Sequence, residues 1–413
     1  MSPDFERKLD NYARLAVEVG VGLAPGQRLL LRAPVECADL ARRITVAAYR
    51  AGALLVDVLF DDEANTLSRF QHAPEASFDE ISTWSADALI KASERGDAIL
   101  RVHGSNPDLL AGQNGGHIAR VQKNLQRYSE PFSRRISAKE VNWSIVAAPV
   151  LPWARRVFPE LAPEAAMDAL WEEIFRICRA DRDDPVAAWR EHTAALKRRR
   201  SHLDGKQYRA LRYRGPGTDL ELGLPEGHCW MGGVSHDRGG HAFVANMPTE
   251  EVFSLPHRER AQGTVAASMP LAYAGSLIEG IRLRFEGGRV VEAHADKGEA
   301  ALTSLLDTDE GARRLGEVAL VPQSSPIAQA GRLYYTTLYD ENAASHLAVG
   351  RAYRVCLTGG VDMDDAAFRA AGGNDSLAHV DFMIGSGQMD VDGVLADGGV
   401  EAVMRGGEWA VEV

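Results

Sequence analysis

Cysteine is scarce in this sequence and is never clustered. The four cysteines lie far apart along the chain, and no Cys-x-x-Cys pair occurs among Cys37, Cys178, Cys229 and Cys356. Small secreted domains that depend on disulfides have a much denser cysteine framework, so this class of protein is excluded. We expect reduced thiols, most of them buried.

Long apolar runs and an excess of positive charge are also absent. No uninterrupted apolar stretch approaches the roughly twenty residues that a membrane-spanning helix needs. Acids and bases are mixed in the N-terminal MSPDFERKLD, which is not the order of a signal peptide. The formal net charge is −12, and a negative chain disfavours a nucleic-acid surface. These absences predict a cytoplasmic protein that has neither nucleic acid nor a membrane as its partner.

The first half of the chain alternates short hydrophobic segments with helical ones. This alternation predicts parallel strands in an open α/β layer. The expected strands are 28–32, 54–60, 98–104 and 143–150, and the expected helices include 5–21, 37–49 and 85–93. Residues 163–203 look helical nearly throughout and end in the basic run 197–200, which we interpret as a solvated helix face.

The second half, from about residue 207, consists of short strands separated by glycines. Residues 282–285 and 289–293 are expected to form a β-hairpin through Glu286, Gly287 and Gly288. A chain of 413 residues with 45% hydrophobic side chains is long enough for two domains. We predict an α/β N-terminal domain with a mostly parallel sheet and a helical extension, residues 1–205. An α+β, antiparallel-rich, metal-binding catalytic domain should follow, residues 206–413.

Two segments of the second half contain candidate catalytic carboxylates. In NMPTEEVF, Glu250 and Glu251 are adjacent, and neighbouring residues of an extended segment point to opposite sides. One of them could bind a metal while the other accepts a proton from water. In LGEVALV, Glu317 opens an apolar run. Either segment alone also fits an exposed carboxylate at the start of a strand.

Two further segments contain candidate imidazole ligands. His346 lies in DENAASHLAV, where the alanines and the apolar spacing predict a short helix over 341–349. In HVDFMIG, His379 and Asp381 are two residues apart in a β-type segment, so both side chains face the same way. A structural histidine or an ion pair explains each segment separately, but not the presence of all four segments in one domain.

The combined donor set is three carboxylates and two imidazoles. Imidazole with carboxylate oxygen suits zinc, cobalt, manganese or iron better than calcium. Five donors exceed the three protein ligands of an ordinary catalytic zinc, but they suffice for two ions that share a carboxylate. The residues alone therefore predict a dinuclear metal hydrolase.

The same four segments, in this order, resemble the metal-site blocks of the thermophilic aminopeptidase family, also called aminopeptidase T, aminopeptidase S or PepS. The resemblance in layout covers nearly the whole chain. It implies two divalent ions (zinc, cobalt, manganese or magnesium), peptide substrates with a free N-terminus, and a homodimer. By the same resemblance the metal ligands are Glu251, Glu317, His346, His379 and Asp381, while Glu250 is the general acid/base and Tyr353 is an active-site hydroxyl.

Two other kinds of protein fit parts of this pattern. A ring-cleaving dioxygenase of dihydroxypyridines looks similar in fold and needs two histidines and one carboxylate on a single Fe(II), which His346, His379 and Asp381 could supply. Such a mononuclear site would leave Glu250, Glu251 and Glu317 unused. A scaffold that merely keeps the architecture is disfavoured by the complete ligand set.

Overall fold

The computed structural model describes residues 2–273 and 275–411. They divide into two compact units, Met1–Glu191 with Val234–Pro248, and His192–Gly233 with Thr249–Val413. The division falls inside helix α8 (Pro185–Lys206). The sequence predicted two domains, residues 1–205 and 206–413. That these two parts fold separately stays a prediction.

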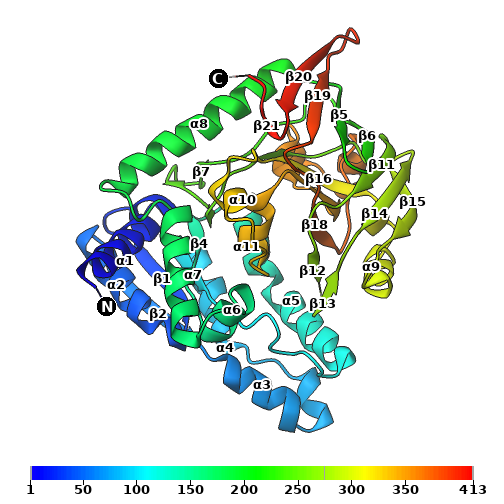
Figure 1. The fold of residues 1–413 in the computed structure, drawn as a ribbon. Helices are drawn as coiled ribbons and strands as arrows, with labels where there is room; N and C mark the ends of the chain where they lie inside the picture. The colour runs from blue at the N-terminus through cyan, green and yellow to red at the C-terminus, as the bar shows by residue number, and fades with distance from the viewer. Residues whose placement is uncertain (1, 274, 412–413) are drawn as a thin grey trace. The chain divides into compact units, whose positions relative to one another are not determined.

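A parallel sheet forms the centre of the first unit (Figure 1). Its strands follow the order β2-β1-β3-β4-β9, and each neighbouring pair is parallel. Buried leucines on both faces of the interior strand β1 explain its continuous apolar run. The strands are β1 (Arg28–Pro34), β2 (Leu55–Asp61), β3 (Ala98–His103), β4 (Trp143–Ala147) and β9 (Asn246–Met247).

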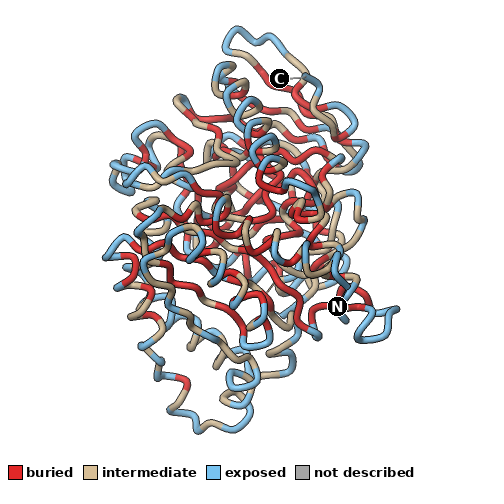
Figure 2. The backbone as a smooth tube through the Cα atoms, turned by 90° about the vertical axis from the view of Figure 1, so that its left-hand side faces the viewer, coloured by how far each residue is buried: buried red, intermediate tan, exposed pale blue. Residues whose placement is uncertain are grey.

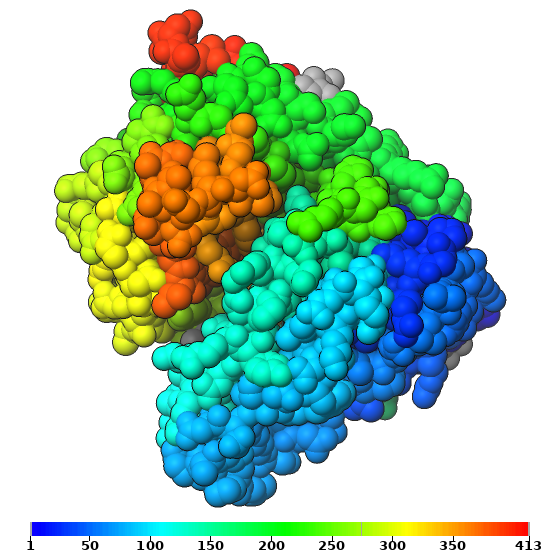
Figure 3. All heavy atoms as spheres, turned by 180° about the vertical axis from the view of Figure 1, so that it is seen from behind, coloured from blue at the N-terminus to red at the C-terminus, as the bar shows by residue number. Residues whose placement is uncertain are grey.

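Helices connect these strands. The first is capped by Ser2, whose side chain accepts a hydrogen bond from the N–H of Phe5 at 3.2 Å, and Pro3 begins the first turn. Helix α5, coloured cyan in Figure 3, has no buried residue among those described. The helices are α1 (Pro3–Leu15), α2 (Ala38–Arg50), α3 (Glu63–His72), α4 (Trp84–Arg95), α5 (Gly115–Ser137), α6 (Leu151–Val157) and α7 (Pro163–Ile177). The short strands β7 (Ser235–His236) and β8 (Ala242–Phe243) complete the unit.

The second unit contains an antiparallel eight-stranded sheet. Its order is β15-β14-β11-β6-β5-β19-β20-β21, so β5 pairs with a strand about 180 residues further along the chain. The predicted hairpin is present as β14 and β15. The strands are β5 (Ala210–Gly215), β6 (Thr218–Gly223), β11 (Ala261–Ala266), β14 (Arg282–Glu286), β15 (Arg289–His294), β19 (Asp390–Val394), β20 (Val400–Arg405) and β21 (Glu408–Trp409).

A second antiparallel sheet of four strands lies in the same unit. Its order is β10-β16-β17-β18, formed by β10 (Val252–Ser254), β16 (Leu315–Leu320), β17 (His346–Gly350) and β18 (His379–Met383). One face contributes Val318, Leu347 and Phe382 to a buried hydrophobic core that also contains Leu222 and Val391 of the larger sheet. Most residues of these four strands are buried, the class that is coloured red along the chain in Figure 2.

Shorter elements complete the second unit. They are β12 (Leu271–Tyr273), β13 (Ser276–Ile278), α9 (Glu299–Leu306), α10 (Pro326–Ala330), α11 (Thr337–Asp340) and α12 (Asp365–Ala370). Together the two units confirm the predicted fold class, an α/β part with a parallel sheet and an α+β part rich in antiparallel strands.

One local prediction was wrong. The segment 341–349 is not a helix, because only Glu341–Ala343 forms a 3-10 turn and His346 begins strand β17. Pairing with β16 on one side and β18 on the other outweighs the helix propensity of the alanines. The basic run is exposed at residues 197 and 198 and half-buried at 199 and 200, where the Arg199 guanidinium lies 5.2 Å from the centre of the Trp409 ring.

The four cysteines are free thiols, and all but Cys229 are buried, as predicted. Among the described residues, no helix is both long enough and apolar enough to span a membrane.

Candidate metal centre

The four-stranded sheet presents its polar residues on one face. Glu317 pairs with Ala348, and Ala348 pairs with Asp381, so these three residues form a row across β16, β17 and β18. His346 and His379 lie two residues from that row on their own strands. Because side chains alternate along a strand, all four predicted ligands of this sheet face the same side. The opposite face is the hydrophobic one.

A β-bulge at Gly316 puts Glu317 on this face. Leu315 pairs with Val349 and Glu317 pairs with Ala348, so Gly316 is the extra residue of β16. In a regular strand, residues two apart such as Leu315 and Glu317 face the same side. The bulge turns them to opposite sides, so that Leu315 points into the core while Glu317 faces the other ligands. A Cβ atom at Gly316 would lie 2.3 Å from the carbonyl oxygens of Gly350 and Arg351, which explains the glycine.

Glu251 reaches the same face from the fourth strand. Phe253 pairs with Ala319, which in turn pairs with His346, and Glu251 lies two residues before Phe253. Its side chain therefore points toward His346, and Oε2 of Glu251 is 3.2 Å from Nε2 of His346. The five predicted ligands come together on one polar surface.

Glu250 has different contacts from its neighbour. Its main-chain N–H donates to Oδ1 of Asn342 at 2.7 Å. Its buried carboxylate lies beside helix α8, where Oε2 is 3.6 Å from Nε2 of His192. The adjacent glutamates thus meet different partners, as expected for consecutive residues of an extended segment.

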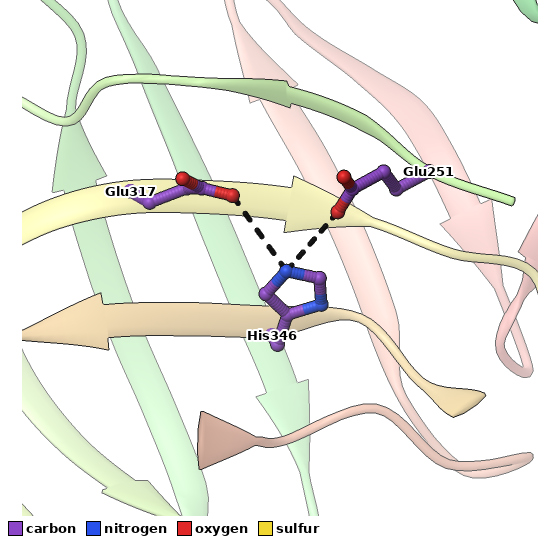
Figure 4. A group of neighbouring side chains, drawn as sticks. All are labelled: Glu251, Glu317 and His346. Carbon is purple, nitrogen blue, oxygen red and sulfur yellow. Dashed lines mark ion pairs between the residues drawn. The ribbon is translucent and has the colours of Figure 1, made fainter. Parts of the chain in front are cut away.

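Glu317 lies between the two histidines. Its Oε1 is 3.7 Å from Nε2 of His346, and its Oε2 is 3.5 Å from Nε2 of His379. Figure 4 shows Glu251 and Glu317 both directed at the His346 ring. Asp381 completes the second group, with Oδ1 3.7 Å from Nε2 of His379. Two sets of three potential ligands result, Glu251–Glu317–His346 and Glu317–His379–Asp381, and Glu317 belongs to both.

The histidines are oriented by main-chain carbonyls. Nδ1 of His346 donates to the Ala344 oxygen at 3.1 Å, and Nδ1 of His379 donates to the Arg351 oxygen at 2.7 Å. When the ring is neutral, as it must be to bind a metal, a proton on Nδ1 leaves the Nε2 lone pair free on the side of the carboxylates. This is the arrangement in which a histidine binds a metal through Nε2 while a second group fixes its ring.

The carboxylates of this cluster are not satisfied by the protein itself. Glu251 Oε2, Glu317 Oε2 and Asp381 Oδ1 are buried and accept no hydrogen bond in the described part of the chain. Burial raises the pKa of Glu317 to about 7, and the charges of Asp381 and Glu251 add to this effect. Burial alone would lower the pKa of His346, but Glu251 and Glu317 hold it well above its ordinary value. Buried like charges of this kind fit a divalent cation held by oxygen and imidazole donors.

Tyr353 lies at the edge of the cluster. Its ring centre is 4.8 Å from that of His379 and 6.0 Å from that of Phe253. Tyr353 as a whole is 39% exposed, but desolvation of its hydroxyl and the negative charges of Glu317 and Asp381 raise its pKa well above the usual value, so the phenol stays protonated and can donate a hydrogen bond.

Sequence reasoning missed two residues near the site. His192 of α8 contacts the Glu250 segment, and nothing in its sequence context pointed to this contact. Glu341 stands in the same segment as His346, and the charges that act on it most strongly are those of Glu251 and Asp381. Its position five residues before a predicted ligand was the available signal.

Buried carboxylates and imidazoles form two overlapping sets of groups that could hold metal ions, which is what a metal-dependent hydrolase requires. The family model described as thermophilic metalloprotease (M29) matches residues 5–409. The chain belongs to this family, which confirms the predicted resemblance and the predicted enzyme class, a metal-dependent peptidase.

Several proteins named as aminopeptidases match the chain over nearly its full length. Aminopeptidase T of Thermus thermophilus is 47% identical over 98% of this chain and 99% of its own. Aminopeptidase 2 of Geobacillus stearothermophilus is 46% identical over 99% of both chains. The solved structure of wild-type AmpT from Thermus thermophilus superposes with a TM-score of 0.94, covering 98% of this chain and all of that one.

A distant likeness also exists. The structure of a dihydroxypyridine dioxygenase from Pseudomonas putida matches with a TM-score of 0.52 at 13% identity. At this identity the likeness shows a shared fold and nothing about activity.

Proposed function

We propose that the protein is an aminopeptidase that removes N-terminal residues from peptides with two divalent metal ions. The observation that carries this proposal is the shared position of Glu317, which directs one oxygen toward each histidine. A carboxylate between two ligand sets is typical of paired metal ions about 3.5 to 4 Å apart.

Each ion would have its own ligands and one shared ligand. Glu251 and His346 would hold the first ion, and His379 and Asp381 would hold the second, with Glu317 as the bridge. When bound, such ions lower the pKa of a water molecule and polarise the scissile carbonyl group. Zinc, cobalt, manganese and magnesium are all candidates, because carboxylate and imidazole donors accept each of them.

The remaining polar groups would handle protons and developing charge. The Tyr353 hydroxyl, kept protonated, would donate a hydrogen bond to the substrate carbonyl as negative charge develops on its oxygen. Glu250 is the proposed general base that later protonates the leaving amine. This role is based on its place beside Glu251, and Oε2 of its carboxylate lies 3.6 Å from Nε2 of His192.

The substrate class follows from the names of the relatives. Those at 40–47% identity over nearly the whole chain are all named aminopeptidases. Peptides with a free N-terminus are therefore the proposed substrates. The homodimer implied by the family and the cytoplasmic location expected from the sequence remain predictions of the same proposal.

Metal content and end specificity test the proposal together. Protein loaded with cobalt, zinc or manganese should contain about two ions per chain and should shorten a free peptide one residue at a time. The N-acetylated form of the same peptide should persist. One bound iron per chain with no peptide hydrolysis would instead support the dioxygenase, and equal cleavage of the acetylated peptide would indicate an endopeptidase.

A further inference from the structure

Two of the four cysteines lie opposite each other on neighbouring segments of the second unit. His228 and Leu357 form an isolated antiparallel bridge. The next opposed pair along the two segments is Cys229 and Cys356, and the main-chain N–H of Cys229 donates to the carbonyl oxygen of Cys356 at 2.7 Å. Opposed residues of antiparallel segments have Cα atoms about 4.5 to 5.5 Å apart. Disulfide bonds span Cα separations of about 4.4 to 6.8 Å, so this pair is within reach of one.

The side chains of the two cysteines point to the same side of this pairing. Leu357 has an extended backbone, with φ −131° and ψ 135°, so the side chains before and after it, those of Cys356 and Thr358, point to one side. The Sγ atom of Cys229 lies 3.4 Å from Oγ1 of Thr358, which puts the Cys229 sulfur on that side. The register agrees, because the N–H of Thr358 donates to the Gly227 oxygen at 2.9 Å.

The two thiols differ in their access to solvent. Cys229 is half-buried and lies beside the exposed Thr358, whereas Cys356 is buried, with an exposed fraction of 1%. A dissolved oxidant can therefore reach Cys229 first. Cys356 is then the thiol that faces the modified sulfur from the opposite segment.

We propose that Cys229 and Cys356 are a redox pair that forms an intramolecular disulfide bond with a low-molecular-weight disulfide as the oxidant. Cys229, as a thiolate, attacks the oxidant, which gives a mixed disulfide and releases one reduced thiol. Cys356 then attacks the Cys229 sulfur, which closes the protein disulfide and releases the second thiol. The oxidant gains the two electrons and two protons that the cysteines lose. This chemistry does not depend on the proposed hydrolysis of peptides.

The bond would join two segments that adjoin the candidate metal centre. Cys356 ends the 3-10 turn Arg354–Cys356, which directly follows Tyr353, and its N–H donates to the Tyr353 oxygen at 3.0 Å. On the other segment, the carbonyl oxygen of Cys229 accepts a hydrogen bond from the hydroxyl of Ser254 in β10 at 2.9 Å. Oxidation therefore connects the turn after Tyr353 covalently to the segment that is hydrogen-bonded to β10.

The test oxidises the full-length, metal-loaded protein and locates the new bond. Reduced wild type, Cys229→Ser, Cys356→Ala and Cys37→Ala are incubated with oxidised glutathione and then alkylated. The last variant is a matched control, because Cys37 is also a buried thiol but lies in the first unit. Mass spectrometry of unreduced peptides identifies linked cysteines, and calorimetry gives the midpoint of thermal unfolding.

The wild type and Cys37→Ala should each give one peptide pair joined through Cys229 and Cys356. Cys356→Ala should stop at the mixed disulfide of Cys229 with glutathione, and Cys229→Ser should give neither product. Closing a long loop with a disulfide typically stabilises the fold, so oxidation should raise the midpoint of the wild type by roughly 5 °C or more. A reducing agent should reverse the rise.

Several results would overturn the inference. The wild type might keep all its thiols reduced, or it might stop at a stable glutathione adduct of Cys229. A link between the Cys229 residues of two chains would mean that this thiol reacts outward instead. A linked pair whose formation leaves the midpoint unchanged or lowers it would contradict a pair that the native register already places for the bond.

Discussion

Glu317 and Asp381 occupy one row of the four-stranded sheet and are separated only by Ala348 on the strand between them. Ala348 is fully buried. Its methyl group is the smallest side chain that an L-residue can present at the floor of the site, so the space above it is left to the carboxylates and to whatever they bind.

Replacing Ala348 with leucine should therefore remove metal binding. The extra atoms would project between Glu317 and Asp381 and would also cost about 1 to 3 kcal/mol in folding free energy by overpacking. Elemental analysis and urea unfolding of Ala348→Leu check both effects. Val349→Leu is the control, because Val349 lies on the opposite, hydrophobic face of the same strand. It should lose stability and keep its metal; metal retention by both variants would contradict the described site.

The adjacent glutamates should respond differently to substitution. Glu251→Ala removes a proposed ligand, so metal content should fall and activity should fall with it. Glu250→Gln keeps the shape but cannot accept a proton, and loss of a general base typically reduces the rate about a hundredfold to ten-thousandfold. This variant should retain both metals while kcat drops. The opposite pattern would exchange the two roles, and full activity in both variants would remove this segment from the site.

Metal removal should destabilise the second unit. The buried carboxylates repel one another when no cation is present, and a ligand at a hundred times its dissociation constant stabilises the folded state by about 2.7 kcal/mol. Chelation should lower the calorimetric midpoint by roughly 5 °C or more, and cobalt or zinc should restore it. Asp381→Asn should respond less to metal. An unchanged midpoint and full peptide hydrolysis after complete chelation would contradict the metal centre.

His103 should make the stability of the first unit depend on pH. Burial, followed by the positive charge of Arg101, lowers the pKa of His103 to about 4. In the unfolded chain a histidine titrates near 6.5, so between these values the unfolded state binds the additional proton. The free energy of unfolding is thus fully maintained above about pH 6.5 and falls as the pH drops toward 4, by about 2 to 3 kcal/mol.

Urea unfolding of metal-free protein at several pH values measures this effect without interference from metal release. His103→Gln cannot be protonated and should show a smaller loss of stability on acidification. An identical pH dependence in the two proteins would mean that other groups cause it.

The alternation of hydrophobic and helical segments was sufficient to predict the fold class, because parallel strands buried on both faces, such as β1, have a distinctive apolar sequence. The candidate ligands were recognisable by residue type and, for His379 and Asp381, by their spacing of two. Strand pairing was not predictable. The turn of 341–343 and the strand that begins at His346 depend on partners in β16 and β18 that are remote in sequence.

The bulge at Gly316 could not be predicted from the sequence. A glycine beside Glu317 has no evident meaning until the register shows that it reverses which face the following residues occupy. The contact between Asn342 and Glu250 was hidden for a related reason, since the buried amide of Asn342 accepts the main-chain N–H of a residue 92 positions away in the sequence.

The register of the four-stranded sheet also means that the metal centre can form only after this sheet has folded. Of the five candidate ligands only His379 and Asp381 are neighbours in sequence, and the others join them only when β10, β16 and β17 have taken their places beside β18. Long-range pairing of this kind forms slowly. A nascent or misassembled chain would therefore take up little metal and remain inactive, so that hydrolytic activity toward peptides would be withheld until the enzyme had reached its native state.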